Sequence, residues 1–266
     1  ARLQALVSPF VLRRVKEDVV ADLPEKIEDT VMAQLAGEQR KLYLANQDRI
    51  AQQVQHREAG EFKKDKLKVL AELTKLRQIC CDPHLHYADY KAGSAKLDTC
   101  MELVHGALDG GHRILLFSQF TGMLDIIGKR LAKEDIAFLK LTGASSKESR
   151  AKMVEQFQAG EVPVFLISLK AGGVGLNLTA ADVVIHYDPW WNVAAQDQAT
   201  DRAHRIGQQH TVTVYKLIAK DTIEERIMQM QESKRDLVNS VLGGDGISSA
   251  LFTREDVLAL LGGDGR

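Results

Sequence analysis

The stretch QATDRAHRIGQ, residues 198–208, carries the side chains best suited to phosphate chemistry. It places Arg202 and Arg205 three residues apart, and on a helix residues at that spacing lie on one face. Each guanidinium group offers a rigid fork of N–H donors that matches phosphate oxygens, so the pair could hold a phosphate chain. The simpler alternative is a solvated helix face in which Asp201 and Arg205 form an ordinary charge pair.

The residues before this stretch favour the phosphate interpretation. Val164 to Ile167 is a short apolar run typical of a buried strand, and Val183 to Tyr187 is another. Between them lies a turn with Gly172, Gly173 and Gly175, and glycine permits both a sharp turn and the close approach of a ligand. This order is typical of phosphate sites in α/β proteins: a strand, a glycine-rich turn, a second strand and a helix.

Four stretches of the chain resemble, in order and spacing, the C-terminal helicase motifs of the SWI/SNF-type ATPases of helicase superfamily 2. The resemblance runs from about Leu12 to Leu242, and the pairing of the glycine-rich motif with DRAHRIGQ is highly specific. One departure is Val193, where many relatives carry proline, and we expect it to alter a loop rather than the chemistry. The four stretches are ILLFSQF (114–120), LTGASSKESRAKMVEQF (141–157), ISLKAGGVGLNLTAADVVIHYDPWWN (167–192) and QATDRAHRIGQ (198–208).

The resemblance implies the second of two RecA-like motor lobes. The sequence has no G-x-x-x-x-G-K-[ST] loop and no acidic pair at a strand end, so we expect the chain alone not to hydrolyse ATP. ATP with Mg²⁺ would be bound mainly by an N-terminal RecA-like lobe of the same protein. Arg202 and Arg205 are then an arginine-finger pair that acts across the interface between lobes. The expected nucleotide contacts are Gly173, Gly175, Gln198 and Asp201.

The resemblance also implies contact with the phosphate backbone of double-stranded DNA, without reading of the base sequence. Hydroxyl groups at strand ends and backbone N–H groups can bind phosphates without a large positive charge, which agrees with the net charge of −1. The alternative for Ser118 and Thr142 is that they cap the following helices. The predicted DNA contacts are Ser118, Gln119, Phe120, Thr142, Gly143, Ser168, Lys170 and Ala171.

Composition fits a globular protein of one large or two small domains. The chain has 266 residues, of which 45% are hydrophobic and 27% charged. Its three cysteines argue against a disulfide framework, and no apolar run is long enough to span a bilayer. We therefore expect an intracellular protein without a membrane partner. The resemblance implies association with DNA, and the compact lobe without long insertions favours a bacterial cytoplasm or nucleoid, with a nucleus as the alternative for a eukaryotic source.

Apolar periodicity predicts an α/β fold, with a mostly parallel sheet flanked by helices and an inserted or appended helical hairpin. The family resemblance implies that this fold is RecA-like. The hairpin is predicted from helices over Gly37 to Gln55 and Lys64 to Cys80. Strands are predicted over Val31 to Leu35, Ile114 to Phe117, Phe138 to Leu141, Val164 to Ile167, Val183 to Tyr187 and Val212 to Ile218. Further helices are predicted over Val11 to Val20, Ser94 to Gly106, Gly122 to Ala132, Ser146 to Gln158, Asn192 to Arg205 and Thr222 to Leu242, with a short one after Thr253.

We divide the chain into an inter-lobe junction (1–33), a helical protrusion (34–93), the RecA-like lobe (94–220) and C-terminal brace helices (221–266).

The residues Cys80, Cys81, His84 and His86 are spaced in a way that resembles a set of metal ligands. Adjacent cysteines seldom both reach one zinc ion, however, so we interpret these two as buried residues at a helix end and predict no metal site. The pair Trp190 and Trp191 is either a platform for stacking bases or, as we favour, a packing element.

Two alternative functions remain at this point. The chain could be a lobe of an RNA-directed or strand-separating superfamily 2 helicase, against which DRAHRIGQ argues. It could also be a catalytically inactive lobe that acts as a protein-binding scaffold, against which the intact Arg202 and Arg205 argue. In the favoured interpretation, a DNA-bound protein is a further partner, as the target that the motor remodels.

Overall fold

The computed structural model describes residues 23–56, 59–169, 171, 176–190, 193–231 and 253–262, without the side chains of 59–64 and 66. Three of the predicted site residues lie outside this part of the chain: Lys170, Gly173 and Gly175. The helix predicted over Val11 to Val20 and the residues Trp191 and Asn192 also lie outside it.

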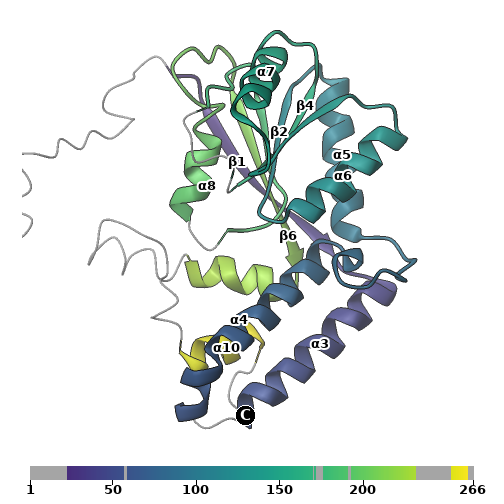
Figure 1. Cartoon of the computed structure of the whole chain (residues 1–266), viewed down its shortest axis with the longest axis vertical. Helices are drawn as coiled ribbons and strands as arrows, with labels where there is room; N and C mark the ends of the chain where they lie inside the picture. The colour runs from purple at the N-terminus through teal and green to yellow at the C-terminus, as the bar shows by residue number, and fades with distance from the viewer. Residues whose placement is uncertain are drawn as a thin grey trace, which may run out of the picture.

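Six parallel strands form one sheet at the centre of the fold, in the order β1-β6-β5-β2-β4-β3 (Figure 1). The inner strands β2, β4 and β5 are buried along their whole length, as expected where helices cover both faces of a parallel sheet. This confirms the predicted α/β, RecA-like fold. The strands are β1 (Lys26–Gln34), β2 (Ile114–Ser118), β3 (Phe138–Leu141), β4 (Val164–Ser168), β5 (Val183–His186) and β6 (Val212–Lys220).

Two pairs of helices cover the two faces of the sheet. Side chains alternate between the faces along each strand, so Leu116 and Ile185 pack with α5 and α6, whereas Leu115 and Val184 pack with α7 and α8. Each face has its own continuous apolar core. The helices are α5 (Ala95–Asp109), α6 (Thr121–Lys133), α7 (Lys147–Gln158) and α8 (Val193–Thr200).

A helical hairpin of α3 (Gly37–Gln55) and α4 (Ala59–Cys81) extends from the carboxyl end of β1 (Figure 1). It shares a third apolar core with the helix at residues 223–231 and with α10 (Arg254–Leu260). The backbone N–H of Ile223 donates to the hydroxyl of Tyr43 at 2.7 Å, which ties the hairpin to that helix. The hairpin prediction is therefore confirmed, with α4 beginning five residues earlier than predicted.

Strand β1 is longer than the strand predicted over Val31 to Leu35. It begins at Lys26 and pairs with β6 along all nine of its residues. Because β1 lies at the edge of the sheet, residues 26–30 are exposed and show no apolar pattern that would reveal a strand. Most of this strand comes from residues that the domain division places in the junction.

Candidate nucleotide and DNA interface

The two arginines of the 198–208 stretch lie on turns and not on a helix. Helix α8 ends at Thr200, so the helix predicted to reach Arg205 is wrong in its last five residues. Tight turns follow, with the N–H of Arg205 donating to the carbonyl of Ala203 at 3.2 Å. Gly207 then has a φ of +101°, which strongly favours glycine. The arrangement of the two arginines therefore comes from this arginine turn, residues 201–207.

One buried amide side chain holds the arginine turn against the rest of the lobe. Gln208 is 6% exposed, and both ends of its amide are hydrogen-bonded. Its Nε2 donates at 2.8–3.1 Å to the carbonyls of Thr179, Ala181 and Ala203, and its Oε1 accepts from the N–H groups of Gln209 and His210. The carbonyl of Arg202 accepts from the N–H of Leu178 at 3.0 Å, so the turn is fixed at two points.

Arg202 lies beneath the turn, against the sheet. It is 6% exposed, and its guanidinium carbon is 5.8 Å from the centroid of the Phe117 ring. Burial and, to a smaller extent, the positive charge of Arg150 lower the pKa of Arg202 to about 10. A buried cation close to a second cation makes this position favourable for an anion, since an opposite charge offsets both desolvation and repulsion.

Arg205 has a different environment, because it is exposed at the tip of the turn. Gln198 and Asp201 are also exposed, and the neighbouring Ile206 is 73% exposed. The structure thus brings the described nucleotide candidates to the accessible end of α8, with Arg202 buried behind them. An arginine that acts across an interface must be reachable from outside its own lobe, and Arg205 meets that requirement.

The predicted DNA contacts within the described part of the chain gather at one edge of the sheet. All strands are parallel, so their carboxyl ends meet at the same edge, where α/β proteins bind ligands. Ser118 and Ser168 end adjacent strands and are partners in the register of β2 and β4. Gln119 and Phe120 follow β2, Thr142 and Gly143 follow β3, and Ala171 follows β4.

Several of these side chains already have partners inside the protein. Ser118 is fully buried, and its hydroxyl donates to Oδ1 of Asp188 at 2.5 Å and accepts from the N–H of Phe120. Ser168 is also buried, at 2% exposed. Thr142 accepts from the N–H of Ala144 within its own turn, and a different residue, Ser146, caps α7. The capping alternative is therefore wrong for Thr142. For Ser118 it is also wrong, because Phe120 is the N-cap residue of α6 and no side chain caps that helix.

Sequence reasoning missed Arg77, which reaches this edge from the helical hairpin. Arg77 is 2% exposed and donates to Oε1 of Gln119 at 3.1 Å and to the carbonyl of Pro189. Gln119 in turn donates from Nε2 to Oδ2 of the fully buried Asp188 at 2.5 Å. The available signal was a charged residue on an otherwise apolar face of α4, four positions after the buried Leu73.

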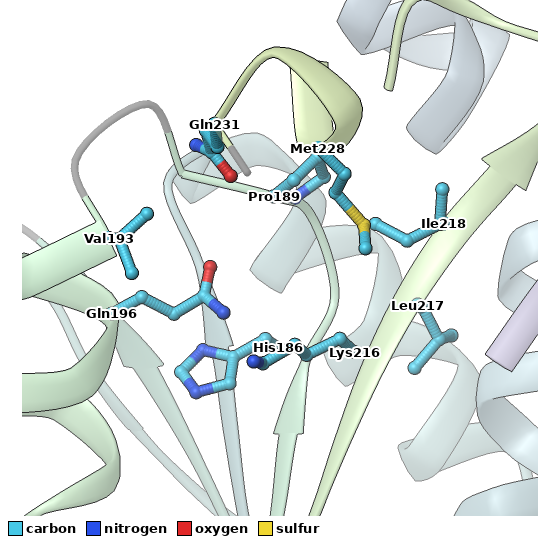
Figure 2. Close-up of a pocket in the computed structure, with 9 residues that line it drawn as sticks. All are labelled: His186, Pro189, Val193, Gln196, Lys216, Leu217, Ile218, Met228 and Gln231. Atoms are coloured by element: carbon cyan, nitrogen blue, oxygen red, sulfur yellow. The ribbon is translucent and has the colours of Figure 1, made fainter. Parts of the chain in front are cut away.

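A cavity of about 110 Å³ lies between α8, the strands β5 and β6, and the helix at 223–231 (Figure 2). Burial lowers the pKa of His186 to about 3, so the ring is neutral at pH 7, and its Nε2 is 2.8 Å from Oγ1 of Thr200. None of the predicted nucleotide or DNA contacts lines this cavity, which is separate from the arginine turn. Its lining residues are His186, Pro189, Val193, Gln196, Lys216, Leu217, Ile218, Met228 and Gln231.

The cysteines and histidines near the end of α4 follow the structural interpretation. Cys80 and Cys81 are buried, and burial raises the pKa of both thiols. His84 is 2.7 Å from the carboxylate of Asp82, and His86 contacts Gln78. Among the residues that the structure describes, no group of three or more His, Cys, Asp or Glu side chains could hold a metal ion.

No helix in the described ranges is long and apolar enough to cross a membrane.

Comparison with known proteins agrees with this architecture. Residues 95–207 match the family described as helicase conserved C-terminal domain, and residues 1–85 match the SNF2-related domain. An uncharacterized ATP-dependent helicase of Mycoplasma pneumoniae is 40% identical over 259 residues, which are 97% of this chain and 25% of the relative. The chain spans about a quarter of the length of the curated relatives it matches.

Two solved structures from Sulfolobus solfataricus are similar along nearly the whole chain. A SWI2/SNF2 ATPase core in complex with dsDNA has a TM-score of 0.75 and 36% identity, with 97% of this chain and 55% of that chain covered. A SWI2/SNF2 ATPase C-terminal domain has a TM-score of 0.72 and 32% identity, with 89% of this chain and 98% of that chain covered. The chain therefore belongs to the SWI2/SNF2 family of superfamily 2 helicases, as a C-terminal helicase lobe.

Proposed function

We propose that the chain is the second motor lobe of an ATP-dependent translocase on double-stranded DNA, of the remodelling type. The observation that carries the proposal is the arginine turn, which presents Arg205 outward beside Gln198 and Asp201 while Arg202 lies beneath it. A cation held at the surface of a lobe with no phosphate-binding loop of its own is suited to act on a nucleotide held by a partner. That partner is the N-terminal RecA-like lobe of the same protein.

Closure of the two lobes would bring Arg205 to the transferring phosphoryl group, whose developing charge it stabilises. An arginine supplied across an interface contributes roughly 10³–10⁵ in rate in comparable NTPases. Arg202 adds fixed positive charge from beneath the turn, and Gln198 and Asp201 orient the arginines or contact the nucleotide. Gly173 and Gly175 would allow the backbone to approach the ribose or the phosphates. ATP with Mg²⁺, bound mainly by the partner lobe, supplies the phosphoryl chemistry.

DNA would bind along the carboxyl edge of the sheet. Because Ser118 and Ser168 are buried, we expect the backbone N–H groups of these loops, together with Gln119, Thr142 and Gly143, to contact phosphates. Phe120, Lys170 and Ala171 complete the proposed surface. The structure of a similar SWI2/SNF2 ATPase core with dsDNA supports this choice of ligand. We place the protein on DNA, with a DNA-bound protein as the target of translocation.

The proposal is tested by ATP hydrolysis with and without duplex DNA. The chain would be assayed alone and in a two-lobe protein in which it follows a lobe that carries the phosphate-binding loop. We expect no turnover by the chain alone and strong stimulation by duplex DNA in the two-lobe protein. Turnover by the chain alone would mean that the phosphate site has been misplaced. Stimulation by RNA but not duplex DNA would favour an RNA helicase, and silence in both would favour a protein-binding scaffold.

The role of Arg205 has a direct test in the same two-lobe protein. We expect Arg205→Ala to lower kcat by about 10³ or more. Arg130→Ala is the matched control, because Arg130 is a half-exposed arginine of α6 that pairs with Glu134. It should keep nearly normal turnover. Near-normal turnover of the Arg205 variant would remove Arg205 from the reaction.

A further inference from the structure

Arg77 joins the helical hairpin to two loops at the carboxyl edge of the sheet. Its guanidinium group donates to Gln119 in the loop after β2 and to the carbonyl of Pro189 in the loop after β5. Its guanidinium carbon also lies 5.7 Å from the centroid of the Phe120 ring. Arg77 comes from α4, 42 positions from Gln119 and 112 from Pro189. One side chain thus fixes three segments that are distant in sequence.

The same two loops are joined a second time through Asp188. Its carboxylate accepts from the hydroxyl of Ser118 at 2.5 Å and from Nε2 of Gln119 at 2.5 Å. The Gln119 amide therefore lies between a cation and an anion, with its oxygen toward Arg77 and its nitrogen toward Asp188. Buried networks of this kind are cooperative, because each group holds the next in its orientation. Without Arg77, the oxygen of the Gln119 amide loses that donor, while the nitrogen keeps Asp188 and the carbonyl of Pro189 as acceptors.

The two loops lead to different parts of the proposed motor. The end of β2 and the loop after it carry Ser118, Gln119 and Phe120, which are proposed DNA contacts. The loop after β5 leads into α8, and α8 ends at Thr200 directly before the arginine turn. The Arg77 contacts therefore lie between the proposed DNA surface and the element that carries Arg205.

We propose that Arg77 is a positioning residue that couples DNA binding at Gln119 and Phe120 to the arginine turn, and so sets how strongly duplex DNA stimulates ATP hydrolysis. This inference rests on the proposed function. The fork of the guanidinium group is essential to it, because one planar group donates to Gln119 and Pro189 at once and also lies over Phe120. Lysine keeps the charge but is a point donor on a flexible stem, so it cannot reproduce this geometry.

The test is Arg77→Lys in the two-lobe protein, with ATP hydrolysis measured across a titration of duplex DNA. We expect the DNA-stimulated kcat to fall about tenfold, the loss typical of one charge-assisted hydrogen bond. Turnover without DNA and the KM for ATP should change less than about twofold, because the hydrogen bonds of Arg77 to Gln119 and Pro189 lie outside the arginine turn. Full stimulation in this variant would overturn the inference.

Arg49→Lys is the matched control. Arg49 lies in the same hairpin, where it pairs with Glu72 between α3 and α4 and contacts neither strand-end loop. It should leave stimulation by DNA unchanged. An equal loss of stimulation in both variants would show that general stability of the hairpin matters and that the Arg77 contacts do not, which would also overturn the inference.

A second variant keeps the inference testable if Arg77→Lys does not fold. Gln119→Ala removes the central amide from a half-buried loop and should also reduce stimulation by DNA. Where both single variants fold, the double variant should lose no more than the more affected single variant, because both act through one network. Additive losses would contradict the coupling. If the unmodified two-lobe protein is not stimulated by DNA, the proposed function fails first, and the two failures are thereby distinguished.

Discussion

Arg202 and Arg205 show how one spacing can place two identical side chains in different environments. Arg202 is buried over Phe117, whereas Arg205 is exposed on the turn that Gly207 closes. With its pKa lowered to about 10, Arg202 remains charged at pH 7. Arg205 is therefore the residue that can act outward, and Arg202 is the fixed charge behind it.

His186 is expected to make the lobe less stable in mild acid. Burial lowers its pKa from 6.5 to about 3. Between these values the unfolded chain binds a proton that the folded protein does not, so the free energy of unfolding falls as the pH falls. The slope from this residue is about 1.4 kcal/mol per pH unit. Urea unfolding between pH 6.5 and pH 5 measures this slope. That pH range lies above the one in which carboxylates titrate.

The matched variants for this prediction are His186→Gln and His56→Gln. His186→Gln should flatten the pH dependence, since the titrating ring is lost. His56 is exposed at the end of α3, and its replacement should keep the original slope. An unchanged slope in His186→Gln would show that His186 does not cause the pH dependence of the free energy of unfolding.

Gly207 should tolerate no side chain, for a reason that lies in the backbone alone. Its φ is +101°, and a Cβ atom built there meets nothing within 4 Å. We expect Gly207→Ala to lower the free energy of unfolding by about 1–3 kcal/mol. Gly106→Ala in α5 also meets open space but has helical backbone, so it should stabilise by about 0.5–1 kcal/mol. Urea unfolding of both variants tests this, and equal effects would contradict it.

At the scale of elements, the sequence predicts best those strands whose two faces are both covered. The strands β2 and β4 differ from the predicted bounds by one residue, because a buried parallel strand is a continuous apolar run. Phe138 to Leu141 has the predicted bounds although β3 lies at the other edge of the sheet and is only partly buried. Strand β1 lies at the edge and lacks that run. Helix α8 was predicted too long because the bonds of Gln208 and of the Arg202 carbonyl, which fix the arginine turn, join it to residues 178–181.

In the candidate site, too, the sequence did not reveal contacts between residues that are distant in the chain. Motif resemblance selected the predicted DNA contacts, and the parallel strands place the described ones at the carboxyl edge. It could not predict Arg77, whose partners are Gln119 and Pro189, because no local spacing relates residues so far apart in the chain. It also could not predict that Ser118 and Ser168 would be buried.

A buried ion pair holds the elements together where the apolar cores meet. Lys96 of α5 and Glu224 are both fully buried, with Nζ 2.5 Å from Oε2. The same carboxylate accepts from the N–H of Ala219 at 2.9 Å. We expect Glu224→Gln to cost about 3–5 kcal/mol, because it leaves the charge of Lys96 buried without compensation. Urea unfolding of the chain measures the loss.

Lys96→Met combined with Glu224→Gln is the informative double variant. It removes the stranded charge and keeps an acceptor for Ala219, so most of the lost stability should return. If the double variant lost as much free energy of unfolding as the two single variants together, the broken ion pair would not explain the loss in Glu224→Gln.

At the scale of the whole molecule, the hairpin lies at the same edge of the sheet as the proposed DNA surface. Strands β1 and β6 run past the inner strands toward it (Figure 1). Arg77 spans the junction between this hairpin and the loops that follow β2 and β5. A force from bound DNA on those loops would therefore reach the hairpin and the arginine turn together.

The charge of the whole chain leads to a prediction about salt. With a net charge of −1, the chain has no general attraction for DNA, and Lys170 is the one charged residue among the proposed contacts. The slope of log affinity against log salt counts the phosphates neutralised. We expect Lys170→Ala to reduce that slope by about one in the two-lobe protein. Thr142→Ala should weaken binding without changing the slope, and Lys129→Ala, on the exposed side of α6, should change neither.

Titration of duplex DNA at several salt concentrations measures these slopes, and the result separates two modes of binding. If Lys170→Ala reduces the slope and Thr142→Ala reduces affinity alone, the lobe holds DNA through uncharged groups at strand ends with one cation among them. If Lys170→Ala leaves the slope unchanged while Lys129→Ala reduces it, DNA lies over the α6 face. The carboxyl edge of the sheet would then lose its assigned role.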